Sequence, residues 1–252
     1  MVAKKQRLDR LILDRGLAPS RQRSRALIMA GKILVNRHPV EKPGTLVSDS
    51  DEIILKGQGT PYVSRGGLKL EAALDAFGIV VKGLVCLDVG ASTGGFTDCL
   101  LQHGAGKVFA VDVGYGQLAW KIRQNPRVKA IERMNIRYMP PEAVGERVDL
   151  VTIDVSFISL KVVVPAVLQF LKDEASILAL VKPQFEVGKG KVGKGGVVRD
   201  AAQHHNVVAE LTHFFSNIGL VRCSLIPSPI LGPKGNKEYL MHLKCDKNKQ
   251  QT

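Results

Sequence analysis

Residues 87 to 96 form a loop of small residues between an apolar strand and a helix, and this junction restricts the folds open to the chain. The segment reads Leu-Asp-Val-Gly-Ala-Ser-Thr-Gly-Gly-Phe. A strand that passes through such a loop into a helix is typical of open parallel sheets, in which ligands bind beyond the carboxyl ends of the strands. A nucleoside cofactor is therefore expected to contact the loop residues Gly90, Ala91, Ser92, Thr93, Gly94, Gly95 and Phe96.

The spacing and charge of this loop select among cofactors. A dinucleotide site needs Gly-x-Gly-x-x-Gly so that bare backbone can approach a pyrophosphate, and Ser92 occupies the middle glycine position here. Asp88 would repel a pyrophosphate but suits an amine or a sulfonium. Asp112, followed by Val113, ends the next apolar strand, where it is expected to hold a ribose diol. S-adenosylmethionine has both cations and no phosphate, so it is the predicted cofactor; the alternative is a glycine-rich turn that only packs a helix against the sheet.

Strand and helix patterns alternate from about residue 60 almost to residue 245. Strands are predicted at 84–89, 107–111, 148–153, 176–181, 219–226 and 238–243, and helices at 67–77, 95–103, 159–171 and 200–216. This order predicts a Rossmann-like α/β domain, a doubly wound sheet, over residues 60–252. Residues 60–66 are expected to be a linker, and the lysine- and glutamine-rich tail at about 245–252 is expected to be disordered.

Four charged residues are expected at one edge of this sheet. Asp154 and Lys182 directly follow two apolar strands, Lys69 opens the first helix of the domain, and Glu238 opens the last strand. Such a set suits methyl transfer to a ribose 2′-hydroxyl, a weak acid that must lose its proton. We assign Lys182 as the base, Asp154 as the group that orients it near the sulfonium, and Lys69 and Glu238 as groups that position the hydroxyl. A plain salt bridge is the alternative for each residue alone.

The chain is strongly basic, with a formal net charge of +13, and this excess indicates a polyanionic partner. Ten basic residues lie within residues 1–37 against two aspartates, and helix and strand patterns continue to a strand at 52–55, which predicts a small α+β domain over residues 1–59. Residues expected to contact phosphates are Arg7, Arg10, Arg21, Arg23, Arg25 and Lys32, with Arg65, Lys189, Lys191 and Lys194 in the larger domain. A solvated basic face is the alternative.

Several of these segments resemble known families. The first domain resembles the S4 RNA-binding fold through Arg7-Leu-Asp9, Ser20-Arg21, Gly31-Lys-Ile33, Val35-Asn36 and Asp51-Glu-Ile53. The four charged residues match the Lys-Asp-Lys-Glu tetrad of the FtsJ-like 2′-O-ribose methyltransferases. A closer resemblance, to the TlyA or haemolysin A family, runs through the segments that begin at Tyr62, Asp88, Asp112, Asp154, Lys182 and Gly235.

The resemblance implies a class I methyltransferase sheet and an activity. The activity would be S-adenosylmethionine-dependent methylation of cytidine ribose in ribosomal RNA of the small subunit, 16S, and in some members also of the large subunit, 23S. It also implies that the S4 domain helps to dock the ribosomal subunit. Two other functions are kept open: a membrane-lysing protein, as the family name suggests, and a ribosome-binding factor without catalytic activity.

Other features argue for a cytoplasmic protein without a structural metal. The first ten residues are mostly charged, unlike a signal peptide, and no apolar run reaches the roughly 18 residues that cross a bilayer. The four cysteines form no Cys-x-x-Cys pair and are expected to be reduced. His204, His205 and His213 lack ligand spacing and are expected on a helix surface. The sequence does not indicate an oligomeric state.

Two further segments have competing interpretations. The run from Gly188 to Gly195 imitates a phosphate-binding P-loop but has no serine or threonine at the magnesium position, and we interpret it as a mobile basic loop that closes over RNA or as an untethered surface loop. Tyr115 and Phe157 are expected near the cleft, where they contact adenine or stack a flipped base, or else pack in the core.

Overall fold

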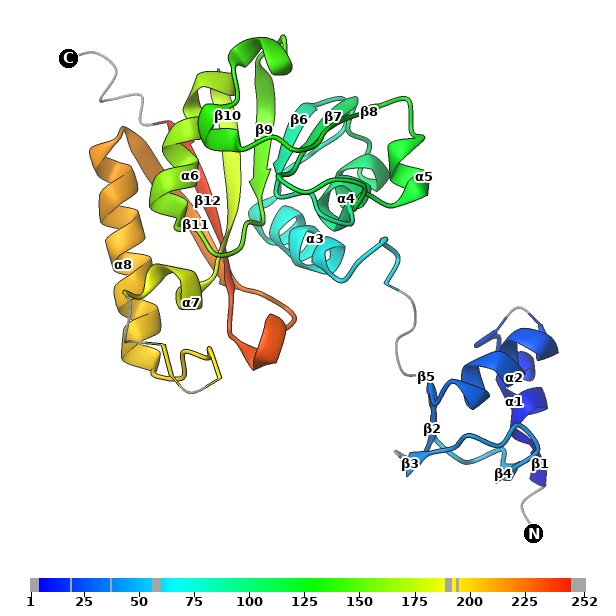
Figure 1. The fold of residues 1–252 in the computed structure, drawn as a ribbon. Helices are drawn as coiled ribbons and strands as arrows, with labels where there is room; N and C mark the ends of the chain where they lie inside the picture. Colours follow the sequence, from blue (N-terminus) through cyan, green and yellow to red (C-terminus); the bar gives the residue numbers. More distant parts are fainter. Residues whose placement is uncertain are drawn as a thin grey trace. The chain divides into compact units, whose positions relative to one another are not determined.

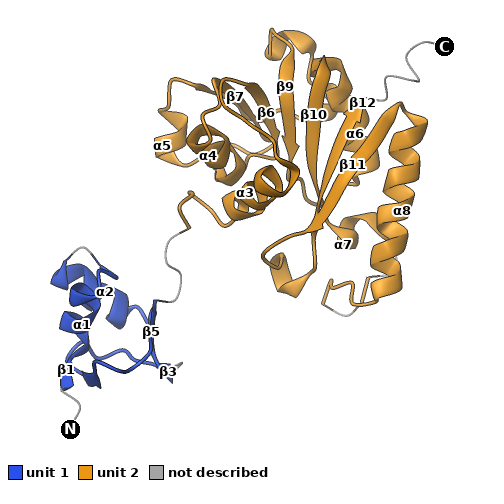
Figure 2. Ribbon diagram, turned by 180° about the vertical axis from the view of Figure 1, so that it is seen from behind, with its two compact units in different colours: residues 1–59 blue, residues 60–252 orange. Residues whose placement is uncertain are grey.

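A computed structural model describes residues 5–18, 20–36, 38–55, 60–188, 192–193 and 195–245 of the protein. The chain divides into two compact units, residues 1–59 and 60–252, which Figure 2 shows in different colours. Each unit has its own hydrophobic core, so each is described separately.

The first unit packs two helices against short strands. Its elements are β1 (Lys5–Arg7), α1 (Leu8–Asp14), α2 (Arg21–Met29), β2 (Ile33–Val35), β3 (His38–Pro39), β4 (Leu46–Ser48) and β5 (Ile53–Leu55). Strand β1 pairs with β4, and β2 lies between β3 and β5, with all pairs antiparallel. Ser20 caps α2 as its hydroxyl accepts a hydrogen bond from the Arg23 amide at 3.2 Å. Helical spacing in α1 buries Leu8 and Ile12 against Ile28 of α2.

The second unit is built on a seven-stranded sheet, which confirms the predicted α/β fold. Its strands are β6 (Val85–Val89), β7 (Lys107–Val111), β8 (Val128–Ile131), β9 (Val148–Ile153), β10 (Leu171–Val181), β11 (Leu220–Pro227) and β12 (Tyr239–Cys245). They lie in the order β11-β12-β10-β9-β6-β7-β8. Strands β6 to β10 are mutually parallel, whereas β12 runs antiparallel between β10 and β11.

Helices cover both faces of this sheet, as Figure 1 shows. They are α3 (Gly66–Phe77), α4 (Gly95–Gln102), α5 (Trp120–Arg123), α6 (Leu160–Val167), α7 (Pro183–Glu186) and α8 (Ala201–Asn217). Short 3-10 turns occur at Ile136–Tyr138, Pro141–Ala143, Leu168–Phe170 and Pro233–Gly235. Because successive side chains of a strand point to opposite faces, Leu87 packs in the core under α6 and α8, and its neighbour Cys86 packs in the core under α3 and α4.

Three sequence expectations need correction in this unit. Strand β8 was missed because it has only four residues and Lys129 interrupts its apolar pattern. The helix expected at 159–171 ends at Val167, and a 3-10 turn leads into β10, which begins at Leu171 although polar residues follow directly. The segment 60–66, expected as a linker, packs on the larger unit: the Tyr62 side chain is buried and its hydroxyl donates to Glu71 at 2.7 Å.

Candidate active site

The order of the strands brings together two segments that are far apart in the sequence. From β6 the chain moves outward through β7 and β8, and it then returns to place β9 on the other side of β6. The loops after β6 and β9 therefore meet at a topological switch point, where open α/β sheets bind ligands. The Asp154 amide donates to the Val89 carbonyl at 2.9 Å. A Cβ atom on Gly90 would lie 2.5 Å from the Asp154 carbonyl oxygen, so only glycine allows this contact.

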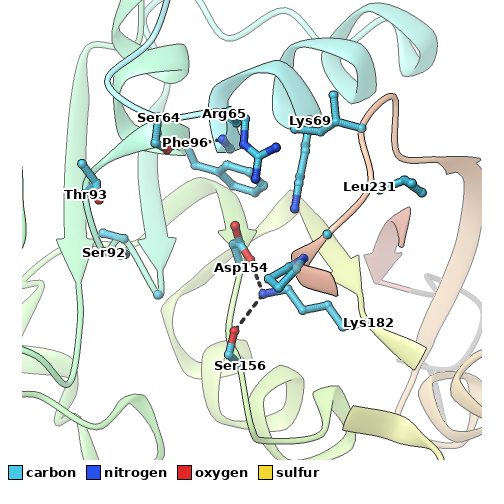
Figure 3. A pocket seen from close by; sticks show the side chains of 17 residues that line it. Ser64, Arg65, Lys69, Ser92, Thr93, Phe96, Asp154, Ser156, Lys182 and Leu231 are labelled. Atoms are coloured by element: carbon cyan, nitrogen blue, oxygen red, sulfur yellow. Dashed lines mark hydrogen bonds and ion pairs between the residues drawn. The ribbon is translucent and has the colours of Figure 1, made fainter. Parts of the chain in front are cut away.

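A cavity of about 440 Å³ opens at this switch point, within the size range of small-molecule sites. Its lining is Ser64, Arg65, Gly66, Lys69, Gly90, Ala91, Ser92, Thr93, Gly95, Phe96, Asp154, Ser156, Lys182, Ile230, Leu231, Gly232 and Pro233. Most of the loop residues expected to contact a cofactor are thus brought together, and their small side chains leave room for a nucleoside. In Figure 3 the side chains of Arg65, Lys69 and Lys182 extend toward the space beside Asp154.

Asp88 does not reach this cavity, which corrects its expected contact with the cofactor. Its side chain is fully buried, and its two oxygens accept hydrogen bonds from the hydroxyls of Thr97 at 2.6 Å and Thr152 at 2.9 Å. Burial raises the pKa of Asp88 to about 6, although these hydrogen bonds favour the charged form and oppose the shift. Asp88 therefore holds the base of the glycine loop and leaves Asp154 as the carboxylate in the cavity.

The other expected cofactor residues outside the cavity lining support or flank the loop. The carboxylate of Asp112 accepts hydrogen bonds from the backbone amides of Ser92 and Gly114, both at 2.7 Å, so it fixes the turn of the loop. Its contact with a ribose diol stays a prediction. Gly94 has a φ of 95°, and Val113 is exposed on the surface. A Cβ on Gly94 would lie 2.8 Å from Leu118, so a larger residue would push the loop out of place.

The four predicted catalytic residues form two ion pairs, in which both lysines and Glu238 are buried and Asp154 is half-buried. The ammonium of Lys182 lies 2.6 Å from Asp154, and that of Lys69 lies 2.5 Å from Glu238. Both lysine side chains are only 10% exposed. Glu238 precedes β12, and the pairing of Tyr239 with Val181 of β10 brings Glu238 next to Lys182. The sequence alone could not place the pairs, because the antiparallel insertion of β12 joins them.

Ser156 completes this network and had no role in the sequence interpretation. Its hydroxyl accepts a hydrogen bond from the Lys182 ammonium at 3.0 Å (Figure 3). The second oxygen of Glu238, Oε1, is buried without a hydrogen-bond partner among the described residues, so one acceptor beside the cavity is unsatisfied. A Cβ atom on Gly232 would lie 2.0 Å from this oxygen, which explains a glycine there. The segment 230–233 carried no sequence signal because only the fold brings it to the site.

Two aromatic residues near the site are exposed, so the alternative of core packing is wrong for both. Phe157 is 90% exposed and has a φ of 64°, a left-handed conformation that is unusual for an aromatic residue. Its ring lies 4.9 Å from that of Phe185. Tyr115 is 67% exposed and stacks with the guanidinium of Arg133 at 4.2 Å. Exposed rings beside cationic groups are suited to stack on unpaired bases.

Some of the basic residues predicted to contact phosphates in the first unit already bind a carboxylate of the same unit. The fully buried carboxylate of Asp9 accepts hydrogen bonds from Arg7 and Arg21, each at 3.1 Å. Burial opposes ionisation of Asp9, yet these two arginines outweigh it and lower its pKa. Arg10 lies 3.9 Å from Asp14, a weak surface pair.

Other expected phosphate contacts are exposed or lie outside the description. Arg23, Arg25, Lys32 and Arg65 are exposed. The expected contacts Lys189, Lys191 and Lys194 lie outside the described residues.

The remaining sequence expectations concern metals, cysteines and membranes. His204 is buried, contrary to the expected surface position, and it contacts the Val198 carbonyl at 2.9 Å and the Tyr239 hydroxyl at 3.1 Å. The four cysteines are free; Cys86 and Cys99 are buried, whereas Cys223 is exposed. Within the described ranges, no cluster of three or more His, Cys, Asp and Glu could hold a metal ion. None of the helices described is long and apolar enough to cross a membrane.

Comparison with known proteins places both units. Residues 62–245 match the model of the FtsJ-like methyltransferases, and residues 6–53 match that of the S4 domain. The chain is 48% identical to the 16S/23S rRNA (cytidine-2′-O)-methyltransferase TlyA of Mycobacterium tuberculosis, over 96% of this chain and 91% of that protein. It is 41% identical to Hemolysin A of Brachyspira hyodysenteriae, over 94% of this chain and 98% of that protein.

A solved structure from Streptococcus thermophilus shares the fold, with a TM-score of 0.76 and 43% identity over 98% of this chain and 90% of that chain. The small residues of the cavity and the Asp154 carboxylate in its lining also fit a phosphate-free nucleoside that carries a sulfonium. The chain therefore belongs to the FtsJ-like methyltransferase family, with an S4 domain, and is an enzyme that uses S-adenosylmethionine as its cofactor.

Proposed function

We propose that the protein methylates the ribose 2′-hydroxyl of cytidine in ribosomal RNA. Two ion pairs support this proposal: Lys182 with Asp154, and Lys69 with Glu238. Both lysines are buried and line the cavity at the switch point. A weakly acidic hydroxyl needs both a base and cations around it before it can act as a nucleophile. Two lysines and two carboxylates in contact supply these groups.

The residues divide the work as follows. S-adenosylmethionine, when bound, supplies a methyl group on a positively charged sulfur. Lys182 acts as a neutral amine: its ammonium first loses a proton to solvent, and the amine then accepts the hydroxyl proton while Asp154 and Ser156 hold it in place. Glu238 accepts a hydrogen bond from the ribose through its free oxygen, and the Lys69 cation stabilises the developing oxyanion.

A second cavity supports the direction from which the nucleotide arrives. Its lining includes Phe157, Phe185 and Lys234, and it shares Ser156 and Lys182 with the first cavity. Methyl transfer is an in-line displacement, so the hydroxyl must lie opposite the sulfur across the methyl carbon. The cofactor then occupies the first cavity and the acceptor nucleotide the second. Phe157 is placed to stack on the base, which favours a nucleotide flipped out of its helix.

Relatives differ in their named substrates, and this difference bears on the target. The Mycobacterium tuberculosis relative named for both 16S and 23S rRNA is 48% identical over 96% of this chain. The Campylobacter jejuni relative named for 23S rRNA alone is 38% identical over 72% of this chain. We therefore propose methylation of 16S and of 23S rRNA on ribosomal subunits in the cytoplasm. The S4 unit, with exposed Arg23, Arg25 and Lys32, docks on the RNA.

The two other functions have less support. The relative named Hemolysin A is the basis for a membrane-lysing activity, and no described helix could span a membrane. A factor without catalytic activity would be free to lose the charged residues of the site, yet all four are present and paired.

The decisive experiment incubates the purified protein and methyl-labelled S-adenosylmethionine with separate small and large ribosomal subunits. We expect label in the 2′-O-methylcytidine of both subunits, and less than about one hundredth of it with Lys182→Ala or Asp154→Ala. Both variants should remain folded and should still bind the ribosomal subunits. Label on a base, or full activity of both variants, would contradict the proposal. Release of haemoglobin from erythrocytes by the wild-type protein and both variants alike would favour the membrane-lysing function.

A further inference from the structure

We propose that Glu186 is a positioning residue that fixes the catalytic base against its partner carboxylate. Its hydrogen bonds join the loop after β9, residues 154–159, to the segment after β10, residues 182–186, and we call this connection the clasp. This inference rests on the proposed roles of Lys182 and Asp154. It assigns a function to a carboxylate that the methyl transfer itself does not use.

Glu186 holds the start of α6 with both of its oxygens. Oε1 accepts the backbone amide of Leu160 at 2.8 Å, and Oε2 accepts the hydroxyl of Ser159 at 2.6 Å. Burial raises the pKa of Glu186 above its ordinary range, whereas these two hydrogen bonds oppose that shift. A half-buried carboxylate that meets the first amide of a helix from another segment ties the two segments together.

Contacts between the same two segments continue up to the base. One ring of the second cavity, Phe157, packs on Phe185 at 4.9 Å between centroids. The Lys182 ammonium then binds Ser156 at 3.0 Å and Asp154 at 2.6 Å. Three sets of contacts therefore join the two segments: those of Glu186, the ring contact, and those of Lys182. Figure 3 shows the contacts of Lys182. Glu186 lies at the end that is farthest from the cavity.

The loop needs such a clasp because its backbone is not in a relaxed conformation. Phe157 has a φ of 64°, which costs free energy for a residue with a Cβ atom and persists only where surrounding contacts impose it. The contacts that impose it are the ring of Phe185 and, two residues further on, the carboxylate of Glu186. Without Glu186 the loop can return to an ordinary conformation. Ser156 and Asp154, which lie just before Phe157, then move relative to Lys182.

The test compares Glu186→Ala with Glu186→Gln in the full-length protein. A glutamine oxygen can still accept the Leu160 amide, and its amide group can donate to Ser159, so this variant keeps the clasp. We expect Glu186→Ala to lower kcat by about 10- to 100-fold, because a small misplacement of reacting groups is costly. The cofactor Kd should change by less than about twofold, and kcat should reach its plateau at a different pH. Glu186→Gln should restore both. The matched control is Glu210→Ala, since the exposed Glu210 carboxylate pairs with Lys161 at 3.1 Å and, among the described residues, forms no hydrogen bond that joins the two segments.

Hydrogen exchange provides a second measurement that needs no substrate. Glu186→Ala should speed amide exchange in residues 154–160, whereas Glu186→Gln and Glu210→Ala should not. If Glu186→Ala speeds this exchange but the wild-type protein methylates no RNA, the proposed function is contradicted and the clasp is still supported. A folded Glu186→Ala protein with wild-type kcat, pH profile and exchange would overturn the clasp. If Glu186→Ala does not fold, Ser159→Ala replaces it, because this variant removes one of the two hydrogen bonds. It should give the same changes on a smaller scale. An unchanged kcat and unchanged exchange in Ser159→Ala would overturn the clasp.

Discussion

Asp88 illustrates how one residue can be singled out correctly and placed wrongly. The sequence puts a carboxylate at the end of a strand, and charge alone suggests that it faces the cofactor. In the structure its side chain is directed into the protein, where two threonine hydroxyls take up its oxygens. The alternation of side chains along β6 decides this, because Leu87 and Val89 pack on the face of α6 and leave Asp88 to the other face. The carboxylate in the cavity comes from Asp154 instead.

We predict that Asp88→Asn removes a pH dependence of stability. The pKa of Asp88 rises from its ordinary 3.8 to about 6, so the folded protein binds the proton more tightly than the unfolded chain. The contribution of Asp88 to wild-type stability should therefore fall as the pH rises from 4 to 7, by about 2 kcal/mol for a shift of this size. Urea unfolding of both proteins at pH 4 and pH 7 measures this difference. A difference between the two proteins that does not change with pH would contradict the prediction.

Elements were more predictable than their pairing. The bounds of β7 and β9 follow directly from apolar runs between polar residues, and the helices at α3, α4 and α8 follow from their apolar periodicity. The order of the strands does not, because pairing is set by contacts that are distant in the sequence. The proposed catalytic residues were predicted from charges at strand ends and at the start of a helix, but the Lys69 to Glu238 contact depends on where β12 inserts. The contacts of Ser156 and Gly232 also had no sequence signal.

The turn before β12 provides a test at the scale of elements. A Cβ atom on Gly232 would lie 2.0 Å from the Glu238 carboxylate, so Gly232→Ala should push Glu238 away from Lys69. We expect kcat to fall by about 10-fold or more, with little change in cofactor Kd. Val80→Ala is the control, because the Val80 side chain is exposed and lies outside the linings of both cavities. Equal kcat values for the two variants in the subunit methylation assay would show that the turn does not fix Glu238.

At the scale of the whole molecule, the methyl-transfer site and the cations proposed to bind RNA through the S4 domain lie in different units. The cavity and the four proposed catalytic residues belong to residues 60–252, whereas residues 1–59 provide exposed cations and a separate core. Two arginines of the first unit, Arg7 and Arg21, are engaged by Asp9, so part of its charge stabilises the fold.

Deletion of residues 1–59 should weaken binding to ribosomal subunits and make it less dependent on salt. Each phosphate contact that is lost reduces the slope of log K against log salt concentration by about 0.7 to 0.9. Affinity for the cofactor should not change, because the cavity lies in the second unit. Filter binding at several salt concentrations, with calorimetry of the cofactor, measures both quantities. An unchanged slope would contradict a role of the first unit in RNA binding.

The proposed roles of Lys69 and Glu238 also predict when activity can begin during synthesis. These residues are 169 positions apart, and the ribosome makes Lys69 long before Glu238. The earlier strands can pair as they emerge, but the site stays incomplete until the residue before β12 has been added and has left the exit tunnel. A nascent chain that stalls earlier carries the cofactor loop and the base without the glutamate. We therefore expect methylation to begin only after nearly all of the described chain has been translated.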